Sequence, residues 1–501
     1  MSKAPRWRRP LGTAIVLFWL VMMGLLAQCE LGGRRVSGPA AAGPRQASAE
    51  PLYLALELAT GERVGLFQMV QAPERRQEQD GVRTTLLARL ALDLMGKRSH
   101  LRVQGVLWQG GELAELDARA RSNDTDFHVE GKLAGGKLAA TLETAGEKIP
   151  FALDLGSQVF LDSGLGAALQ LPTCEEGEVV RFESFDPLSM SSTPARLECF
   201  GQETLELAGE KIVARRLKVR SGGLESVAFI DADGNVLRAE TPFGFVLEKI
   251  SAREALAPLG DEAAGAAGAA PDGPGWLGLT AVETTGKKPF RGAGRLVARL
   301  SGGPPPPRDG AQALLPDGSL EIFAGRRPGD EPRQAETAGE PAKFLRAEPL
   351  IQSDHPKMVE MARQIAGAER DPGKLALAIN EWVFRRLDKE PVLSLPSALE
   401  VLERRRGDCN EHAVLFVALA RAAGLPSRVA IGLVWSDENG GFFYHAWPEA
   451  LLDDGWHRYD PTLDQPTADA THLKLLEGGV ESWPQLLAFL GRLRIEVLAA
   501  E

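Results

Sequence analysis

The chain has 501 residues, of which 44% are hydrophobic and 25% are charged, so it is long and apolar enough for two or three packed domains. Its formal net charge is −11. Because a protein that binds a phosphate backbone needs clustered Lys and Arg, this balance argues against nucleic acid as a partner.

The first 30 residues have the pattern of a membrane signal. Four basic residues in "MSKAPRWRRP" precede an uncharged stretch at 11–28, which is at the lower length limit for a membrane-spanning helix. We expect 1–30 to be an uncleaved anchor with its N-terminus in the cytoplasm and the bulk of the chain outside, in the periplasm. A cleaved signal peptide and a lipoprotein modified at Cys29 remain alternatives, although Gln28 is large for a lipoprotein signal. All three place the bulk of the chain outside the cytoplasm.

The next segments predict a tether followed by β-structure. Residues 31–50 are small, polar and rich in Pro and Gly, which indicates a flexible tether. Residues 51–256 show short alternating runs separated by turn signals such as Thr60–Gly61 and Asp233–Gly234–Asn235. We therefore expect a large antiparallel β-rich domain.

The second half predicts a multidomain arrangement that ends in an α+β domain. Residues 257–278 have the composition of a linker, and 279–345 predict a small β unit interrupted by a proline run. From 346 to 501 the pattern changes to three apolar-periodic stretches, then a fourth helix after Cys409 that Gly424 ends, and then strand-like runs. Helices followed by an antiparallel sheet are an α+β layout.

The four cysteines fall into different settings. In an exported chain Cys174 and Cys199 could form a disulfide, or they could be two buried thiols. Cys409 stands apart, with His and Asp residues downstream, which is the pattern of a thiol nucleophile. Asp408 is placed to cap the helix that follows, and this puts Cys409 in the first turn, where free N–H groups and the helix dipole favour a thiolate.

A base and an orienting carboxylate are available on the strands that follow. His445 lies in the strand-like run "FFYHAWPEALL", and Asp460 ends the run "WHRYDPT". Two adjacent antiparallel strands can place these side chains together, so that the carboxylate orients the imidazole and the imidazole pairs with the thiol. We predict Cys409, His445 and Asp460 as a catalytic triad.

The residues around the triad strengthen this prediction. The stretches "RGDCNEHAVLFVALARAAGLPSRVAIGLVW", "FYHAWPEALL" and "GWHRYDPT" closely resemble the transglutaminase-like superfamily, in particular its bacterial, membrane-anchored, papain-like members. The resemblance covers about residues 350–490. It implies attack by Cys409 on a carboxamide, a thioester intermediate, and transfer to an amine or to water, with His445 as base and Asp460 as its partner. Protein or peptide amides are the implied substrates.

Other polar and aromatic residues near the motif have less specific roles. We expect Gln465, Asp469 and His472 to shape the cleft or close the fold rather than to act in catalysis. Asn380 and Trp382 in "INEWVF" could approach the site and help to bind an oxyanion, although Trp382 is better explained by core packing. The backbone N–H of Cys409 is the better oxyanion donor. The sequence leaves open whether Tyr444, Trp435 and Trp447 line a substrate groove.

Two alternatives remain beside the thiol enzyme. Cys409, His412 and His445 could instead form a zinc site, although metal clusters usually show a second close pair of ligands. We expect no metal and no other cofactor, since no acidic loop of calcium-binding pattern is present. The other alternative is a non-catalytic envelope protein that uses its β-rich domain for binding or assembly. The oligomeric state is not predicted.

Overall fold

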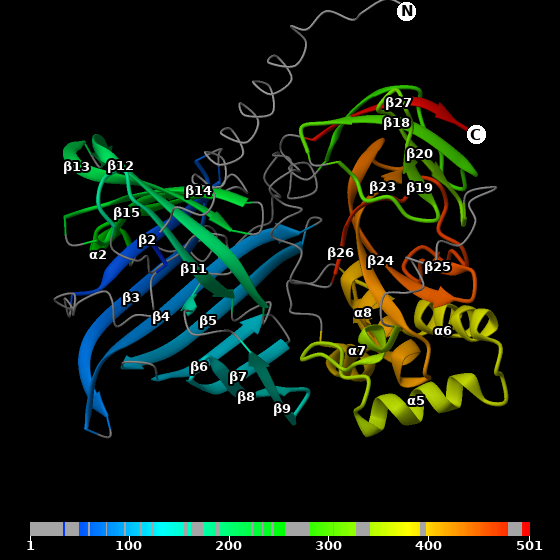
Figure 1. The fold of residues 1–501 in the computed structure, drawn as a ribbon, viewed down its shortest axis with the longest axis horizontal. Coiled ribbons are helices and arrows are strands. Elements are labelled where there is room, and N and C mark those ends of the chain that lie inside the picture. Colours follow the sequence, from blue (N-terminus) through cyan, green and yellow to red (C-terminus); the bar gives the residue numbers. More distant parts are fainter. Residues whose placement is uncertain are drawn as a thin grey trace, which may run out of the picture.

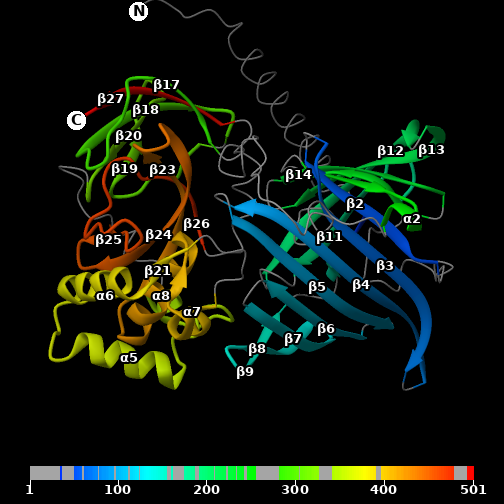
Figure 2. The ribbon, with the colours of Figure 1, turned by 180° about the vertical axis from the view of Figure 1, so that it is seen from behind.

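The computed structural model of the chain describes most residues between 50 and 501. The described residues are 34–35, 50–58, 61–76, 78–94, 97–110, 113–122, 125–154, 159–161, 174–186, 191–207, 209–221, 224–232, 234–241, 245–255, 281–303, 305–326, 341–390, 397–478 and 493–501. They form a large curled β-sheet and a mixed α/β part, which lie side by side (Figure 1). The view from behind shows the same two parts next to each other (Figure 2).

The large sheet confirms the predicted antiparallel β-rich region. Among the described residues its order is β1-β11-β12-β13-β14-β15-β16-β2-β3-β4-β5-β6-β7-β8-β9, with β10 also paired to β11. Its strands are β1 (Arg34–Arg35), β2 (Leu52–Leu58), β3 (Arg63–Arg76), β4 (Gln79–Leu94), β5 (Lys97–Gly110), β6 (Leu113–Ser122), β7 (Thr125–Ala134), β8 (Lys137–Thr144), β9 (Glu147–Asp154), β10 (Val159–Leu161), β11 (Val179–Asp186), β12 (Ser191–Leu207), β13 (Glu210–Ser221), β14 (Leu224–Ile230), β15 (Val236–Glu240) and β16 (Phe245–Lys249). The pairs are antiparallel except those of β1 and β10 with β11.

The sheet curls around an apolar core. Leu54 of β2, Phe67 of β3 and Phe182 of β11 share one buried cluster with Leu217 of β13, although β2 and β3 lie far from β11 in the sheet order. Strands such as β8 alternate buried and exposed residues, as expected when one face packs on a core and the other meets water. The structure also joins Cys174 and Cys199 in a disulfide beside this core, with their Cα atoms 6.3 Å apart.

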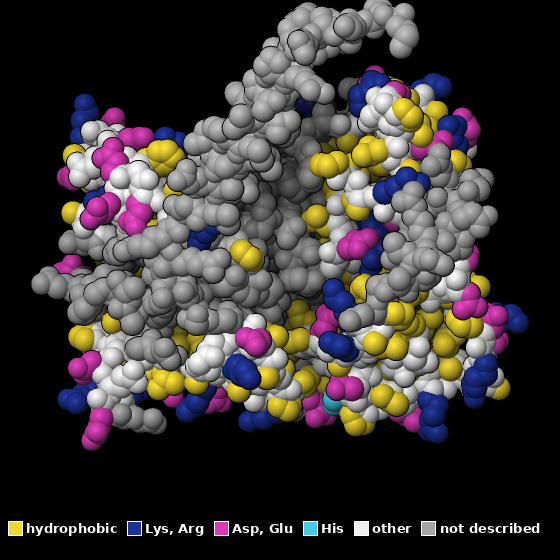
Figure 3. Space-filling model, viewed as in Figure 1, with side chains coloured by type: hydrophobic (Ala, Val, Ile, Leu, Met, Phe, Trp, Pro, Cys, Tyr) yellow, Lys and Arg dark blue, Asp and Glu magenta, His cyan; other side chains and the backbone are white. Residues whose placement is uncertain are grey.

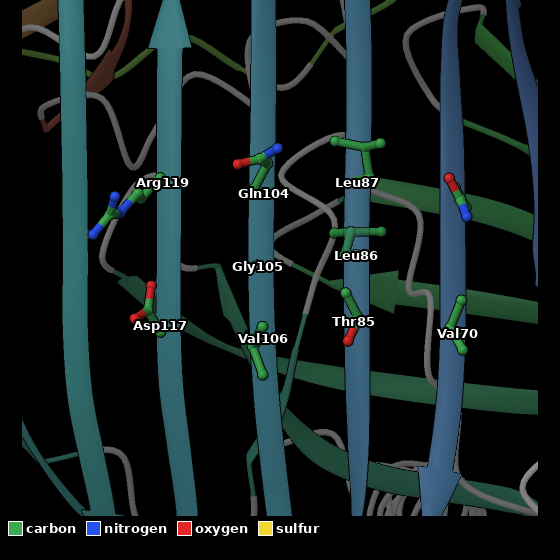
Figure 4. Close-up of a pocket in the computed structure, with 10 residues that line it drawn as sticks. Val70, Thr85, Leu86, Leu87, Gln104, Gly105, Val106, Asp117 and Arg119 are labelled. Atoms are coloured by element: carbon green, nitrogen blue, oxygen red, sulfur yellow. The ribbon is translucent and has the colours of Figure 1, made fainter. Parts of the chain in front are cut away.

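The outer face of the large sheet has a shallow depression. It spans β3 to β6 and has a volume of about 510 Å³. Side chains that line it point out from the sheet, among them Thr85, Leu87, Gln104 and Arg119 (Figure 4).

Two smaller sheets form the β-structure of the C-terminal part. The first has the order β17-β27-β18-β20-β19, so the end of the chain pairs with strands from 283–323. The second has the order β25-β24-β23-β26. Their strands are β17 (Glu283–Gly286), β18 (Arg295–Ser301), β19 (Gln312–Leu314), β20 (Leu320–Phe323), β23 (Ser427–Ser436), β24 (Gly441–Leu452), β25 (Gly455–Arg458), β26 (Leu473–Glu477) and β27 (Arg494–Ala500).

The helices of the C-terminal part begin at the residues that favour helix starts. Asp371 caps one helix, and Pro356 and Pro372 stand in the first turns of two helices, where a missing N–H has no cost. The helical segments are α2 (Ala252–Ala255), η3 (Pro341–Leu345), α5 (Pro356–Ala366), α6 (Pro372–Arg386), α7 (Ala398–Arg404) and α8 (Cys409–Ala422), and a short parallel pair is formed by β21 (Asp388–Lys389) and β22 (Arg406–Gly407).

One apolar core unites the C-terminal part. Leu296 of β18, Ile495 of β27, Phe416 of α8 and Ile431 of β23 belong to the same buried cluster. The five-stranded sheet, the helices and the four-stranded sheet therefore pack on one another as a single body. This body positions the candidate site, because α8 lies in its centre.

The large sheet contacts the C-terminal part through β8 and β9. Leu350 belongs to the apolar cluster of β5 to β8. The Thr144 hydroxyl donates to Glu400 of α7 at 3.2 Å, and both residues are buried. Lys357 of α5 bridges Glu147 of β9 and Glu403.

Within the described residues, none of the helices has the length and apolar character needed to cross a membrane. The predicted anchor at 1–30 and the predicted linker at 257–278 lie outside the described residues, as does the predicted tether at 31–50 except for Arg34, Arg35 and Glu50.

Candidate active site

Cys409 is the first residue of α8, as the sequence predicts. Asp408 caps this helix through the backbone N–H of Asn410, and Glu411 returns the contact by accepting the N–H of Asp408, which completes a capping box. A Cβ atom at Gly407 would lie 2.3 Å from the Glu411 side chain, so glycine is needed there for this close turn. The sequence "RGDCNE" thus fixes the place of the thiol.

His445 lies on β24, directly against α8. Its strand partner is Gly432 of β23, where a Cβ atom would meet the Leu473 carbonyl at 2.0 Å. The N–H of Ala446, the next residue on β24, hydrogen-bonds the Cys409 sulfur. The structure therefore places the thiol beside the strand segment that carries His445.

Asp460 completes the group at the end of β25. Its Oδ2 lies 2.8 Å from His445 Nε2, and its Oδ1 accepts the backbone N–H groups of Thr462 and Leu463. Burial opposes the charge, but the two histidines that hydrogen-bond it hold the pKa of the Asp460 carboxyl well below its usual range. Because Nε2 of His445 faces this carboxylate, Nδ1 is the ring nitrogen left for the thiol.

The thiol itself is in an unfavourable place for a charge. Cys409 is partly buried, and burial raises the pKa of its thiol well above the usual range. The Asp408 and Glu411 carboxylates raise the pKa further, whereas the Ala446 N–H lowers it. Burial and these carboxylates oppose the thiolate that the helix start is expected to favour. A thiolate here depends on a cation beside it.

A second histidine, His472, also binds Asp460, and the sequence did not predict this contact. His472 Nε2 lies 2.9 Å from Asp460 Oδ2, and His472 Nδ1 lies 3.2 Å from Asp469 Oδ1. Both His472 and Asp460 are fully buried. The spacing of Asp469 and His472, three residues apart in "DATH", was the available signal, but only the tertiary fold brings the pair to Asp460.

Two of the three aromatic candidates, Trp435 and Trp447, are buried in the core. Trp447 is fully buried and stacks on His445 with ring centroids 6.1 Å apart. Trp435 is buried and donates to Asp437. Tyr444 differs, because it is half-buried and its hydroxyl donates to Asn410 Oδ1 at 2.7 Å, next to Cys409.

The other sequence candidates lie beside the site in structural roles. Asn380 is buried and donates to the Gln465 carbonyl at 3.3 Å. Trp382 packs against the core, and the Arg405 guanidinium lies 4.5 Å from its ring centroid. Gln465 donates to Asp469, which supports its expected part in closing the fold.

His412 does not join a metal site with Cys409. It is fully buried, its Nδ1 lies 2.7 Å from the Asp408 carbonyl, and burial lowers its pKa to about 4, so the ring is neutral. Among the described residues, the donor atoms grouped closely enough for an ion belong to His445, Asp460 and His472, within 4.8 Å of one another. Hydrogen bonds of the two imidazoles to one carboxylate account for that grouping.

A buried charge cluster supports the site from behind. Lys474 of β26 is fully buried, and its ammonium lies within 3.0 Å of Glu449, Asp309 and Glu477. Arg458 of β25 binds Asp309 at 2.7 Å and also donates to the His472 carbonyl at 3.1 Å. The loop at 305–311 is thereby tied to the strands that carry the site.

Comparisons with known proteins identify a family for part of the chain. The family model of the transglutaminase-like superfamily matches residues 359–461. An uncharacterized protein of Mycobacterium leprae is 28% identical over 116 residues, which cover 22% of this chain and 41% of that protein. The chain thus matches less than half of the length of this relative.

Solved structures show weaker likenesses. One from Cytophaga hutchinsonii, described as a candidate cysteine protease, has a TM-score of 0.26 and 16% identity, and covers 41% of this chain and 81% of its own. A candidate protease from Parabacteroides distasonis has a TM-score of 0.21 and 12% identity, with 76% and 64% covered. A β-barrel-like protein from Brucella abortus has a TM-score of 0.29 and 12% identity, with 40% and 95% covered.

The family match spans the segment that carries Cys409, His445 and Asp460, in the order that the sequence resemblance requires. The C-terminal part of this chain therefore contains a domain of the transglutaminase-like superfamily.

Proposed function

We propose that this protein is a thiol enzyme that cleaves or transfers protein or peptide amide groups through Cys409, His445 and Asp460. The observation that carries the proposal is the hydrogen bond of 2.8 Å between His445 and Asp460, on the strand whose next N–H binds the Cys409 sulfur. A buried carboxylate on one ring nitrogen leaves the other nitrogen free to take the proton of a thiol.

The proposed reaction has two balanced halves. His445 takes the thiol proton, and the Cys409 sulfur forms a bond with the amide carbonyl carbon. The C–N bond then breaks, and the leaving nitrogen takes that proton from His445, which gives a thioester. Water or an amine next loses a proton to His445 and forms the new C–O or C–N bond, and the thiol is released.

Local geometry supports the remaining roles. Burial and nearby carboxylates raise the pKa of the thiol, so the imidazolium of His445 is the cation that makes a thiolate accessible. The backbone N–H of Cys409 lies in the first turn of α8, where it has no intrahelical acceptor, and is the proposed oxyanion donor.

The cellular setting is part of the proposal. The basic N-terminus and the uncharged stretch at 11–28 favour a membrane-anchored protein with its catalytic part outside the cytoplasm. Protein or peptide amides of the cell envelope are then the substrates within reach. The non-catalytic alternative is favoured by the depression on the outer face of the large sheet, which would be its binding surface.

The test is the alkylation rate of Cys409 by iodoacetamide against pH, measured on the full chain by mass analysis of the peptide that contains Cys409. We expect reaction well below pH 8.5, the ordinary pKa of cysteine, and a rate at pH 7 that falls at least about tenfold in His445→Ala. His457→Ala is the matched control, because His457 pairs with Asp454 on the surface of β25.

A Cys409 thiol that reacts only at high pH, at the same rate in wild type and in His445→Ala, would overturn the proposal. That result would direct attention to the depression on the large sheet and to the binding-module alternative.

A further inference from the structure

Asp460 binds one histidine more than a triad requires. Its Oδ2 atom is shared by His445 Nε2 at 2.8 Å and His472 Nε2 at 2.9 Å. The three side chains are between 0% and 6% exposed, so water cannot take the place of either hydrogen bond. The second histidine therefore acts on the same carboxylate oxygen as the proposed base.

The partners of His472 fix its protonation state. Its Nε2 faces the Asp460 carboxylate, and its Nδ1 faces the Asp469 carbonyl at 3.1 Å and the Asp469 carboxylate at 3.2 Å. All three partners are acceptors without a proton to give, so both ring nitrogens must donate, and the ring is an imidazolium. These bonds also raise the pKa of His472, although burial opposes the charge.

Asp469 is held in place as firmly as Asp460. Its Oδ1 accepts from the Thr471 backbone N–H, and its Oδ2 accepts from the Gly292 N–H at 2.9 Å and from Gln465. Burial opposes the charge, but His472, the Thr471 hydroxyl and the Gly292 N–H hold the pKa of the Asp469 carboxyl well below its usual range. Asp469 is therefore a fixed anion on the far side of His472.

The other charged groups around His472 are already balanced. Arg458 meets only its backbone carbonyl and is paired with Asp309. Lys474, two residues along, is paired with Asp309 and two glutamates. On β24, Trp447 is uncharged and packs edge-on against His472, with ring centroids 5.2 Å apart. On the Asp460 side of His445, two carboxylates and one imidazolium remain, while the Asp408 carboxyl acts on His445 from the start of α8.

We propose that His472 and Asp469 are positioning residues that set the proton affinity of His445 through Asp460. The imidazolium of His472 cancels one of the two buried negative charges, so that the Asp460 side of His445 carries a single net negative charge. It also holds the Asp460 carboxylate by the same Oδ2 atom that His445 binds. This inference rests on the proposed function, since its readout is the Cys409–His445 pair.

Charge-changing variants give the sharpest test. In His472→Gln the cation is lost and two carboxylates remain, so the pKa of the Cys409 thiol rises. We expect the midpoint of the alkylation profile of the full chain to move up by about one pH unit. The double variant His472→Gln/Asp469→Asn removes one charge of each sign, and its midpoint should return to the wild-type value.

If His472 and Asp469 had a purely structural role, the midpoints of the two variants would fall in the opposite order. The double variant would then be further from wild type than the single variant, and this result, or a single variant whose midpoint equals that of wild type, would overturn the inference. His128→Gln is the matched control, because His128 also lies between two carboxylates, Asp117 and Glu143, but on the sheet surface. Its midpoint should not move.

A measurement without substitution guards against misfolded variants. The chain has seven histidines, so ring-¹⁵N labelling of histidine lets nitrogen chemical shifts report their protonation. We expect both ring nitrogens of His472 to be protonated at pH 7.5, and a neutral His472 would end the proposal. A wild-type thiol that is not activated would instead refute the proposed function, and the nitrogen shifts would still decide the charge of His472.

Discussion

Among the described residues, His128 and His472 each lie between two carboxylates, but the carboxylates around them differ in how far they are buried. His128, on the large sheet, faces Asp117 and Glu143, whose side chains are 55% and 44% exposed. His472, in the C-terminal part, faces Asp460 and Asp469, which are 0% and 5% exposed. Water can replace any partner of His128. It cannot do so for His472, where each donor must keep its acceptor.

The same difference holds for the two regions as a whole. The ion pairs described on the large sheet are partly or fully exposed; in Arg121–Asp126 the side chains are 69% and 53% exposed. Acidic and basic side chains are interspersed on the face that Figure 3 shows. In the C-terminal part Lys474, Arg458 and Glu449 are buried together. Charges therefore keep the sheet soluble, whereas behind the site they hold elements in one geometry.

The largest effect is expected from a substitution that breaks the buried charge cluster around Lys474. Lys474→Met leaves Glu449 and Asp309 buried beside too few cations, and we expect a loss of about 3–5 kcal/mol in the free energy of unfolding. Urea unfolding followed by tryptophan fluorescence measures it. Lys132→Met is the control on the large sheet, because Lys132 is 72% exposed in its pair with Glu115. Equal midpoints for the two variants would remove the distinction between the regions.

Removing the charge of the orienting carboxylate should affect chemistry more than stability. In Asp460→Asn the imidazolium of His445 loses its buried anion, and we expect the alkylation rate of Cys409 at pH 7 to fall on the order of 10²-fold. Asp454→Asn is the control, since Asp454 binds His457 at the surface. A fall of less than threefold in Asp460→Asn would show that Asp460 does not tune His445.

Acid should weaken the C-terminal part through His412. Burial lowers its pKa to about 4, so between pH 6.5 and 4 the unfolded chain binds a proton that the folded chain does not. Stability therefore falls as pH falls through this window, by about 2–3 kcal/mol from this group. His472 does not add to the loss there, because a raised pKa stabilises the fold below 6.5 and the effect is lost only at higher pH.

The measurement is the unfolding midpoint in urea at pH 7.0 and at pH 4.5, in wild type and in His412→Asn. The Asn side chain can still donate to the Asp408 carbonyl, so the variant tests the titration and keeps that hydrogen bond. The wild type should lose more stability than the variant on acidification. An equal loss in both would assign the acid sensitivity to other groups.

The sequence predicted the parts of the fold and site that depend on neighbouring residues, namely helix capping and the alternation of strands. The pattern "GDC" before an apolar-periodic run placed Cys409 at a helix start, because capping depends on neighbours within four residues. Alternating runs likewise indicated the antiparallel sheet, which period-two patterning specifies. Motif order in the sequence is enough to name Cys409, His445 and Asp460, and the structure brings His445 and Asp460 within hydrogen-bond distance.

What the sequence could not predict depends on tertiary burial. His472 needed the fold to bring β26 beside Asp460, and no spacing rule connects them. The raised pKa of Cys409 also escaped prediction, because helix-start chemistry favours a thiolate while burial opposes it, and only the fold decides which effect is larger. The pairing of β27 with β17 and β18 is a long-range contact of the same kind.

The smallest expected effect lies where the two regions meet. Thr144 of β8 and Glu400 of α7 form a buried hydrogen bond, and burial raises the pKa of the Glu400 carboxyl. Thr144→Val removes one hydrogen bond at nearly constant volume, and we expect a loss of about 1 kcal/mol in the free energy of unfolding. Thr141→Val is the control, because Thr141 lies on the same strand in a half-buried position. If the large sheet and the C-terminal part unfold as one unit, the Thr144 variant lowers the unfolding midpoint of both regions together. Separate transitions in which only one midpoint moves would show that this contact does not couple them.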